Sequence, residues 1–412
     1  MNIYDVDTEW ILRLIDDYIQ EHFIIISNPD FETILMDDLK QICGIVDDDE
    51  DMSDEDSILN EHHIMDDPLY ECLYYYYIHF MPRRSFDTTF IYQHPNISEV
   101  TRHLDILRGK PQPSQRTPEW YEYRNKVITA SSLYKIFGSE ALRNELIYEK
   151  CSTPPRMDNG DVSISALSVN TTSALHWGIK YEPVSILIYE DVYSTRIESL
   201  GCITHEEHDF IGASPDGVNA NPDSPLYGRL IEIKNVKSRE IDGTICEQYW
   251  VQMQIQMEVC NINDCDFLET KFVEYDSYND YLTDTVVDSD NIEYEYNGCL
   301  DLFYKGLIIY FHKDTEGPTY VYKPLCIKTL EEEIVWETDV INKYQSEGYH
   351  WITNIYWKLV VFNCQLVLRN RFWFSKVFPA ISDFWEIIKY DRINGSDHRK
   401  PSKRTKKMEQ LL

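Results

Sequence analysis

Apolar residues in the first hundred positions recur at helical spacing. The first series is spaced at intervals of one, three and four residues: Ile11, Leu14, Ile15, Tyr18 and Ile19. This pattern predicts an amphipathic helix over 8–26, and residues 32–46 repeat it more weakly. Residues 58–80 predict another helical stretch, which ends in the tyrosine-rich sequence ECLYYYYIHF. Four consecutive tyrosines would occupy every side of a helix, so we expect some of them in the core.

The segment TPEWYEYRNKVITASSLYKIFG, residues 117–138, predicts two short helices. Trp120 and Arg124 fall in the first, and the second is expected to begin near Ser131 or Ser132. A serine at the start of a helix caps free backbone N–H groups. The same groups can bind a phosphate, for which Arg124 would supply a bidentate clamp. A structural cap and a phosphate site both fit this pattern.

Polar and apolar residues alternate in the stretch LIEIKNV, residues 230–236, which predicts a strand. Alternate side chains of a strand share a face. Glu232 and Lys234 should therefore point to one side of the sheet, while Ile231 and Ile233 point to the other. On its own, an E-x-K strand is most often a solvated face.

The segments around this strand predict a mixed α/β sheet. A turn-forming SPDG sequence places Asp216 before it, and the helical stretch ALHWGIKYEPVSILIYEDVY presents Glu182 among apolar residues. The helix predicted for EQYWVQMQIQMEVC puts Gln252 and Gln256 on one face, with Gln254 away from it. The strand-like DFLETKFVEY follows, which completes the order strand, strand, helix, strand. Farther along, the pattern predicts a helix over 329–346 and then a strand-rich stretch.

Two carboxylates beside a lysine can support phosphodiester hydrolysis. Asp216 and Glu232 could hold a divalent cation, and Lys234 could contact a water molecule or a phosphate. His205 and His208 also stand next to acids, but they fall in a predicted turn. We interpret these histidines as solvated loop residues in preference to metal ligands.

The overall charge narrows the range of functions. The 412 residues carry a formal net charge of −33, which argues against unspecific coating of DNA. A nuclease is still compatible with this charge, because a metal-loaded groove can be locally positive. The hydrophobic content of 43% predicts a globular chain, and the ten cysteines include no C-x-x-C pair that would favour a zinc ribbon. An acidic N-terminus and the lack of a membrane-spanning apolar run predict a soluble, intracellular protein without a membrane segment.

Three prolines, Pro111, Pro113 and Pro118, mark a boundary. We predict three regions: a helical, acidic accessory region over 1–110, an α/β domain with a C-terminal elaboration over 111–392, and a basic tail over 393–412.

Three stretches of biased composition are predicted to be loops or tails. Residues 47–57, DDDEDMSDEDS, contain eight acids and predict a flexible loop, with a DNA-mimicking or partner-docking strip as the alternative. The acidic, tyrosine-rich residues 276–299 predict an insertion loop. Residues 399–407 contain six basic residues in nine, which fits a nucleic-acid contact, a nuclear-import patch or a solubilising tail equally.

Five motifs in this order resemble the YqaJ-type viral recombinase nucleases, the family of bacteriophage lambda exonuclease within the PD-(D/E)XK superfamily. They are RNKVITAS, HWGIKYE, GASPDG, IEIK and YWVQMQIQM, and the resemblance covers residues 117–275. It implies a restriction-endonuclease-like core, a central mixed sheet flanked by helices. The connection between Asp216 and Glu232 is longer than in the phage enzyme and contains NPDSPLYG, which we expect to affect loop contacts more than the site.

The resemblance implies a role for each matching residue. The ligands of Mg²⁺, which Mn²⁺ could replace, would be Glu182, Asp216, Glu232 and the backbone carbonyl of Ile233. Lys234 would position and activate the attacking water, and Gln254, taken as the second Gln of the Q-x-Q pair, would assist it. The residues that would grip the 5′ phosphate are Arg124, Ser131 and Ser214.

The implied function is a Mg²⁺-dependent 5′→3′ exonuclease that acts on double-stranded DNA ends and leaves 3′ single-stranded tails for recombination, replication or repair. The flanking regions resemble those of enlarged members from large DNA viruses. Two alternatives stay open: a structure-specific endonuclease of the same fold, and a non-catalytic scaffold. The resemblance also implies a single-strand annealing protein as a partner, a homo-oligomer as an option, and the host cytoplasm or nucleus as the compartment.

Overall fold

The computed structural model describes residues 8–45, 68–113, 117–152, 170–284, 295–296, 299–300, 304–313 and 317–400. The acidic stretch 47–57, most of the sequence between residues 285 and 303, and the tail beyond residue 400 lie outside these residues. The predictions made for those stretches concern parts of the chain that the structure does not describe.

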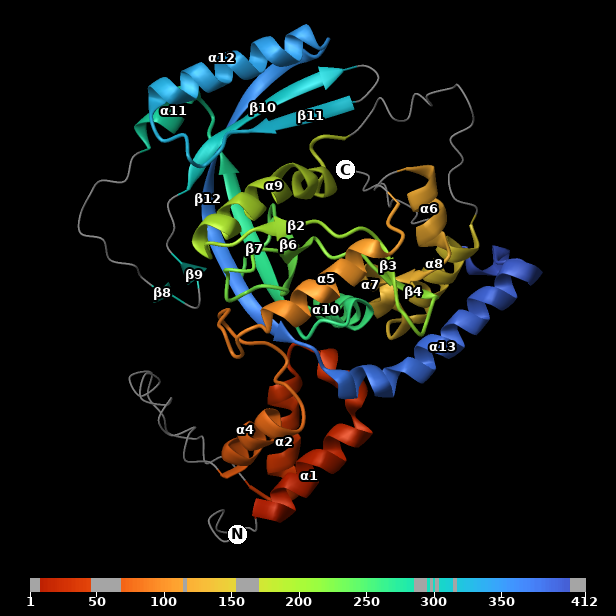
Figure 1. Ribbon diagram of the computed structural model, residues 1–412. Coiled ribbons are helices and arrows are strands. Elements are labelled where there is room, and N and C mark those ends of the chain that lie inside the picture. The colour runs from red at the N-terminus through yellow and green to blue at the C-terminus, as the bar shows by residue number, and fades with distance from the viewer. Residues whose placement is uncertain are drawn as a thin grey trace, which may run out of the picture.

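A long mixed sheet forms the centre of the molecule (Figure 1). Its strand order is β11-β10-β12-β7-β6-β5-β2, and β8 and β9 pair beside β12. β6 and β7 run parallel, whereas the other neighbours along this order are antiparallel. The strands are β2 (Ile197–Glu198), β5 (Gly217–Asn219), β6 (Leu230–Val236), β7 (Asp264–Glu274), β8 (Glu295–Tyr296), β9 (Cys299–Leu300), β10 (Lys305–Lys313), β11 (Gly317–Tyr322) and β12 (His350–Leu368).

Two helices cover opposite faces of this sheet. α9 (Ala174–Val192) packs Val184 and neighbouring apolar residues against a cluster that contains Ile233. α10 (Glu247–Cys260) packs Met253 and its neighbours against a second cluster that contains Leu230. β6 is therefore enclosed between two helices, and its polar residues Glu232 and Lys234 face one of them, α10.

A small second sheet lies beside α10, in the order β1-β4-β3. β1 (Ile128–Thr129) pairs in parallel with β4 (Ile211–Ala213), and β3 (Ile203–Thr204) pairs antiparallel with β4. The short helix α7 (Ala130–Leu133) follows β1 directly and packs against both α10 and β4. α6 (Pro118–Asn125) precedes β1, and α8 (Glu140–Cys151) follows after the short 3-10 helix η3 (Tyr134–Ile136).

β12 belongs to two parts of the molecule at once. Its first half pairs with β10 and its second half pairs with β7. The end formed by β10 and β12 carries α12 (Leu330–Ser346) on one face, where Phe311 stacks on Tyr344. Figure 1 shows α12 and α11 (Tyr278–Thr283) at this end, remote from the N-terminal helices.

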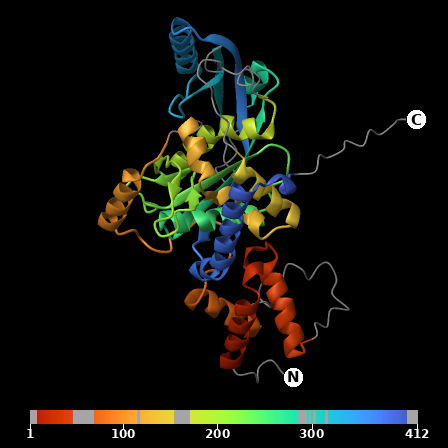
Figure 2. The same ribbon diagram turned by 90° about the vertical axis from the view of Figure 1, so that its right-hand side faces the viewer.

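The N-terminal helices form the opposite end of the molecule, as the two views in Figures 1 and 2 agree. They are α1 (Thr8–Glu21), the 3-10 helix η2 (Phe23–Ser27), α2 (Phe31–Cys43) and α4 (Pro68–His79); α5 (Ile97–Gly109) follows near the sheet. The long helix α13 (Arg371–Asn394) and the 3-10 helix η5 (Asp397–Arg399) close the described chain. α13 contacts both η2 and α8, so it ties the N-terminal helices to the α/β part.

The predicted fold class, a mixed α/β sheet flanked by helices with a helical N-terminal region, is confirmed. The helices predicted over 329–346 and around Glu182, and the strand predicted at 230–236, are present. Two local predictions were wrong. The helix expected over 8–26 ends at Glu21, after which η2 begins, and the loop expected at 276–299 starts with α11. Ser277 caps that helix by accepting from the Asp280 N–H, a local signal that the acidic composition concealed.

Candidate active site

β6 places Glu232 and Lys234 on the α10 side of the sheet and Ile231 and Ile233 on the α9 side. Both isoleucines belong to the cluster that contains the α9 residues, whereas Glu232 contacts α10. The alternation predicted from the sequence therefore describes the strand, but the polar face is buried and not solvated. Glu232 is only 1% exposed.

The Glu232 carboxylate is held by two glutamines of α10. Gln252 Nε2 donates to Oε1 and Gln256 Nε2 donates to Oε2, each at 2.6 Å. The Lys234 ammonium forms an ion pair with the same carboxylate. A buried charge is costly unless it is paired and hydrogen-bonded, and these three donors meet that requirement and fix the orientation of the carboxylate.

Asp216 reaches the same strand from the turn between β4 and β5. Its Oδ2 accepts from the backbone N–H of Ile233 at 2.7 Å. Burial, followed by repulsion from Glu232, raises the pKa of Asp216 well above its usual range. The negative charge of Glu182 raises the pKa of Asp216 further, whereas Lys234 lowers it. The three predicted acids therefore lie within electrostatic range of one another.

Lys234 stays charged in this setting. Burial alone would lower its pKa, but the Glu232 and Asp216 charges outweigh burial and raise the pKa above the usual range. Its ammonium also lies 4.7 Å from the ring centroid of Tyr249 in α10. Glu182 is half-buried on α9, and its charge also reaches Tyr322 of β11.

The donor set suits a hard divalent cation. Magnesium and calcium prefer oxygen ligands, and the mutual repulsion of Asp216, Glu232 and Glu182 would be relieved by a bound positive charge. Within the described ranges, no three His, Cys, Asp or Glu side chains are gathered into a complete metal site by themselves. Asp216 and Glu232 are the two side chains best placed to hold an ion, with Glu182 at longer range.

Gln254 lies elsewhere, which corrects its predicted place beside Lys234. Its Nε2 donates to the carbonyl of Leu368 at 3.0 Å, and its Oε1 accepts from the Asn370 N–H at 2.7 Å. It therefore joins α10 to the turn between β12 and α13. Gln252 and Gln256 contact Glu232 instead. The family resemblance did not point to these two residues, but their spacing of four residues puts them on one helix face and could have predicted a shared contact.

The residues predicted to grip a 5′ phosphate lie around the small sheet. Thr129 of β1 pairs with Gly212 of β4, and the two strands run parallel. Ser131 and Ser214, each two residues farther along, therefore follow the same ends of these strands. Ser131 is exposed and Ser214 is half-buried. The cap position of α7 is Thr129, not Ser131 or Ser132 as predicted.

Arg124 approaches from α6, where its guanidinium carbon lies 4.6 Å from the ring centroid of Trp120. The pair therefore shares one side of α6, as their spacing of four residues implies.

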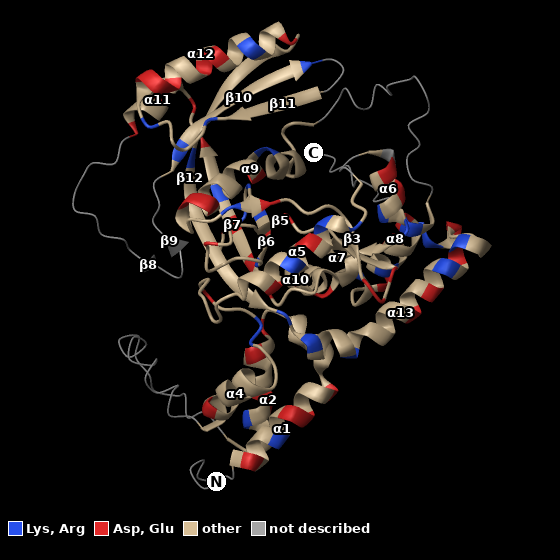
Figure 3. Cartoon of the chain, in the orientation of Figure 1, with Lys and Arg blue, Asp and Glu red and all other residues tan. Residues whose placement is uncertain are grey.

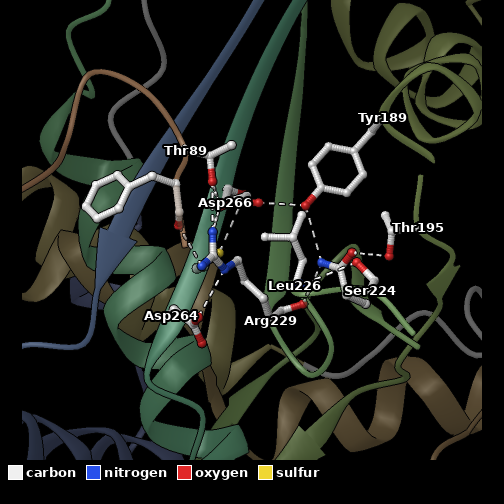
Figure 4. A network of polar contacts seen from close by, with 11 residues as sticks. Thr89, Tyr189, Thr195, Ser224, Leu226, Arg229, Asp264 and Asp266 are labelled. Atoms are coloured by element: carbon white, nitrogen blue, oxygen red, sulfur yellow. Dashed lines mark hydrogen bonds and ion pairs between the residues drawn. The ribbon is translucent and has the colours of Figure 1, made fainter. Parts of the chain in front are cut away.

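The start of β6 is anchored by a buried arginine, Arg229, which is 2% exposed (Figure 4). Its Nε donates to Asp264 at 3.0 Å, and its Nη1 donates to Asp266 at 3.0 Å and to Thr89 at 2.8 Å. Tyr189 of α9 donates to the other oxygen of Asp266 at 2.6 Å. This network fixes β6 to β7, three residues before Glu232.

The two predicted loop histidines are packed and not solvated. The rings of His205 and His208 stack at 4.7 Å, and His208 stacks on Phe378 of α13 at 4.0 Å. His205 also faces Glu258 of α10, with 3.7 Å between Nε2 and the carboxylate. These residues anchor α13 to the turn before β4.

A family model decides the assignment of this part of the chain. Residues 119–263 match the model of the YqaJ-like viral recombinase domain. The chain carries a YqaJ-like viral recombinase domain. This domain spans α6 to the end of α10, so it contains Glu182, Asp216, Glu232 and Lys234.

A relative extends the similarity beyond the YqaJ-like domain. An uncharacterized protein of Acanthamoeba polyphaga mimivirus is 31% identical over 330 residues, which cover 73% of this chain. The match spans only 57% of the length of that relative.

Solved structures are similar at low identity. The alkaline exonuclease LHK-Exo from Laribacter hongkongensis is 15% identical, with a TM-score of 0.35 and coverage of 68% of this chain and 95% of that one. Its complex with dAMP gives 16% identity and a TM-score of 0.36, again with 68% and 95% coverage. A phage-related exonuclease from Haemophilus somnus is 13% identical, with a TM-score of 0.30 and coverage of 64% and 94%.

The described part of the chain also contains no helix that is both long enough and apolar enough to cross a membrane.

Proposed function

We propose that this chain is a metal-dependent deoxyribonuclease that degrades double-stranded DNA from its ends in the 5′→3′ direction. The observation that carries the proposal is the arrangement on β6. Glu232 and Lys234 share a buried face there, and Asp216 is hydrogen-bonded to the residue between them. The YqaJ-like viral recombinase domain around this site supports DNA as the substrate and recombination as the process.

In this proposal Asp216 and Glu232 would hold Mg²⁺ or Mn²⁺, together with the Ile233 carbonyl, and Glu182 would complete the negative charge. The ion, when bound, would lower the pKa of a water molecule and neutralise charge on the phosphate. Gln252 and Gln256 keep the Glu232 carboxylate in one orientation. Lys234 would orient the attacking water, and Arg124, Ser131 and Ser214 would bind the 5′ phosphate of the strand being digested.

The products would be 3′ single-stranded tails, which is why a single-strand annealing protein is the proposed partner. The mimivirus relative supports a role in a large DNA virus, with the host cytoplasm or nucleus as the compartment. Homo-oligomerisation stays a separate prediction.

The proposal is tested with linear duplex DNA that carries a label on either the 5′ or the 3′ end and either a 5′ phosphate or a 5′ hydroxyl. We expect release of 5′ mononucleotides that requires Mg²⁺ and is faster with the phosphate. Asp216→Asn should lower the rate by roughly 10²–10³, the usual cost of losing one group that stabilises charge at a reaction centre. The control is Asp383→Asn, an exposed acid on α13, which should keep the activity.

Three outcomes would redirect the proposal. Cleavage of closed circular duplex would favour the structure-specific endonuclease. Equal rates for Asp216→Asn and the unsubstituted protein would place the chemistry elsewhere. An absence of metal-stimulated hydrolysis on every substrate would favour the non-catalytic scaffold.

A further inference from the structure

The sheet face that carries Glu232 and Lys234 extends onto the neighbouring strand β7. In the parallel pairing of β6 and β7, Lys234 stands opposite Glu269, and Val236 stands opposite Lys271. Paired residues of neighbouring strands point to the same side of a sheet. Glu269 and Lys271 therefore lie on the same face as the catalytic candidates.

Glu269 holds an arginine from the loop after β6. Its carboxylate is 1% exposed and accepts from Nη2 of Arg239, whose side chain is 44% exposed. Nη1 of Arg239 donates to the carbonyl of Glu240 at 3.1 Å. The other carboxylate oxygen of Glu269 has no hydrogen-bond partner in the described part of the chain. A buried acid thus fixes one side of the guanidinium and leaves the rest of it toward solvent.

One lysine beside this arginine has no acidic partner in the described ranges. Lys271 donates to the carbonyl of Arg239 at 3.3 Å and forms no ion pair there. Its charge therefore remains available to an anion from outside the protein, since a carbonyl dipole does not neutralise it. Lys237 lies on the α9 side instead, where it donates to the Thr172 carbonyl at 2.6 Å and its ammonium lies 5.4 Å from the ring centroid of Trp177.

The arginine lies close to the catalytic candidates. Tyr249, whose ring lies 4.7 Å from the Lys234 ammonium, is also within electrostatic range of Arg239. Burial lowers the pKa of Arg239, but Glu269 and then Tyr249 raise it above its usual value. Two acids, Glu240 and Asp242, follow in the same loop. Asp242 turns back into the loop, where its Oδ1 accepts from the Thr244 N–H at 2.9 Å.

We propose that Arg239 and Lys271, the cationic strip, bind backbone phosphates of the DNA strand next to the bond that is hydrolysed, and that Glu269 positions Arg239. The inference rests on the proposed function and adds a substrate contact to it. A chain with a net charge of −33 repels DNA over most of its surface. Binding therefore depends on local cations, and a planar guanidinium held by a buried carboxylate matches phosphate geometry.

The test is equilibrium binding of a labelled duplex, measured by fluorescence anisotropy in EDTA at several salt concentrations, so that no hydrolysis occurs. Each phosphate contact contributes about 0.9 to the slope of log affinity against log salt. Arg239→Gln and Lys271→Gln should each weaken binding by roughly threefold to tenfold and lower the slope by about one. The matched control is Arg13→Gln, an exposed arginine of α1 that is paired with Glu9 and should leave both quantities unchanged.

The substitution Glu269→Gln distinguishes the positioning of Arg239 from the effect of net charge on DNA binding. Removing a negative charge should strengthen DNA binding if only net charge matters. If Glu269 holds Arg239 in place, binding should instead weaken, and it should not weaken further when Arg239→Gln is added. Tighter binding by Glu269→Gln in a protein with an unchanged melting temperature would overturn the positioning role.

The strip and the nuclease proposal can fail separately. Hydrolysis by the unsubstituted protein, with unchanged salt slopes in both strip variants, would overturn the strip and leave the nuclease proposal standing. If the salt slopes of the strip variants decrease as expected but the protein never hydrolyses DNA, the strip would be supported and the nuclease proposal would be wrong. An unsubstituted protein that does not bind duplex at any salt concentration would overturn the strip.

Discussion

Glu232 lies at the centre of the candidate site, where three donors converge on one buried carboxylate. Each hydrogen bond to a buried charge contributes about 1.5–3 kcal/mol to stability. The two glutamines that supply such bonds stand four residues apart on α10, whereas Gln254 between them points to the β12–α13 turn. Neighbouring glutamines of one motif therefore make different contacts.

Substitution of these glutamines should separate catalysis from folding. Gln256→Ala should lower nuclease activity and also cost about 1–3 kcal/mol of unfolding free energy, because Glu232 loses a donor. Gln254→Ala should cost a similar free energy, since the Asn370 N–H loses its acceptor, yet keep the activity of the folded enzyme. Urea denaturation and single-turnover digestion would measure the two quantities. An equal loss of activity in both variants, at matched stability, would contradict this separation.

The sequence predicted the strand residues better than the helix residues. The alternation of Glu232 and Lys234 with two isoleucines fixes their faces, whatever the strand packs against. The choice of Gln254 came from a family resemblance, and helical spacing by itself favoured the pair at 252 and 256. Which helix faces Glu232 depends on tertiary packing, and that information is not local.

At the scale of elements, α13 is attached to the YqaJ-like domain by stacked rings. His205 Nδ1 accepts from the backbone N–H groups of Glu207 and His208, both at 3.1 Å, which fixes the orientation of its ring. His208 lies between the His205 ring and Phe378 of α13. His208 is therefore enclosed between two rings, which disfavours its charged form.

The stability of this attachment should decrease in acid. Burial, then the neighbouring His205, lowers the pKa of His208, with Glu207 and Glu258 opposing the shift. A histidine with a lowered folded-state pKa stabilises the fold fully above its unfolded pKa of about 6.5, and this stability is lost as the pH falls below that value. His208→Phe, which keeps the stacking, should show a smaller drop in melting temperature between pH 7.5 and 5.5 than the unsubstituted protein. Equal drops in the two proteins would refute the assignment.

The order of elements in the YqaJ-like domain was predictable from hydrophobic periodicity, but several pairings were not. β1 pairs in parallel with β4 across more than eighty residues, and both strands are only two or three residues long. Such short strands leave almost no alternating pattern. β12 was recognisable as a strand, yet nothing local indicates that its two halves pair with different partners.

On the scale of the whole molecule, the N-terminal helices and the central sheet are joined by hydrogen bonds between distant residues. Ser27 donates to Glu247 at the start of α10 at 2.7 Å, and Trp250 donates to the carbonyl of Arg84 at 2.8 Å. The N–H of Phe86 donates to the Leu366 carbonyl of β12 at 2.9 Å. Figure 3 shows acidic and basic residues together on α1, α12 and α13.

Substitution of Arg229 tests whether the N-terminal helices and the central sheet form one cooperative unit. Arg229 contacts β7 through Asp264 and Asp266, and the N-terminal region through Thr89. Arg229→Met should cost about 3–5 kcal/mol of unfolding free energy, since two buried acids lose their partner. Arg108→Met removes an exposed ion pair with Glu198 and should cost at most about 1 kcal/mol.

Hydrogen exchange read separately in α1 and in β6 would show where the Arg229→Met loss occurs. In a single cooperative unit, protection should fall by the same free energy in both elements. If α1 alone lost protection while β6 kept it, the segment around Thr89 would be a hinge between independently stable parts. The N-terminal helices would then be able to detach without disturbing Glu232, and a regulatory role for them would have to be sought in that motion.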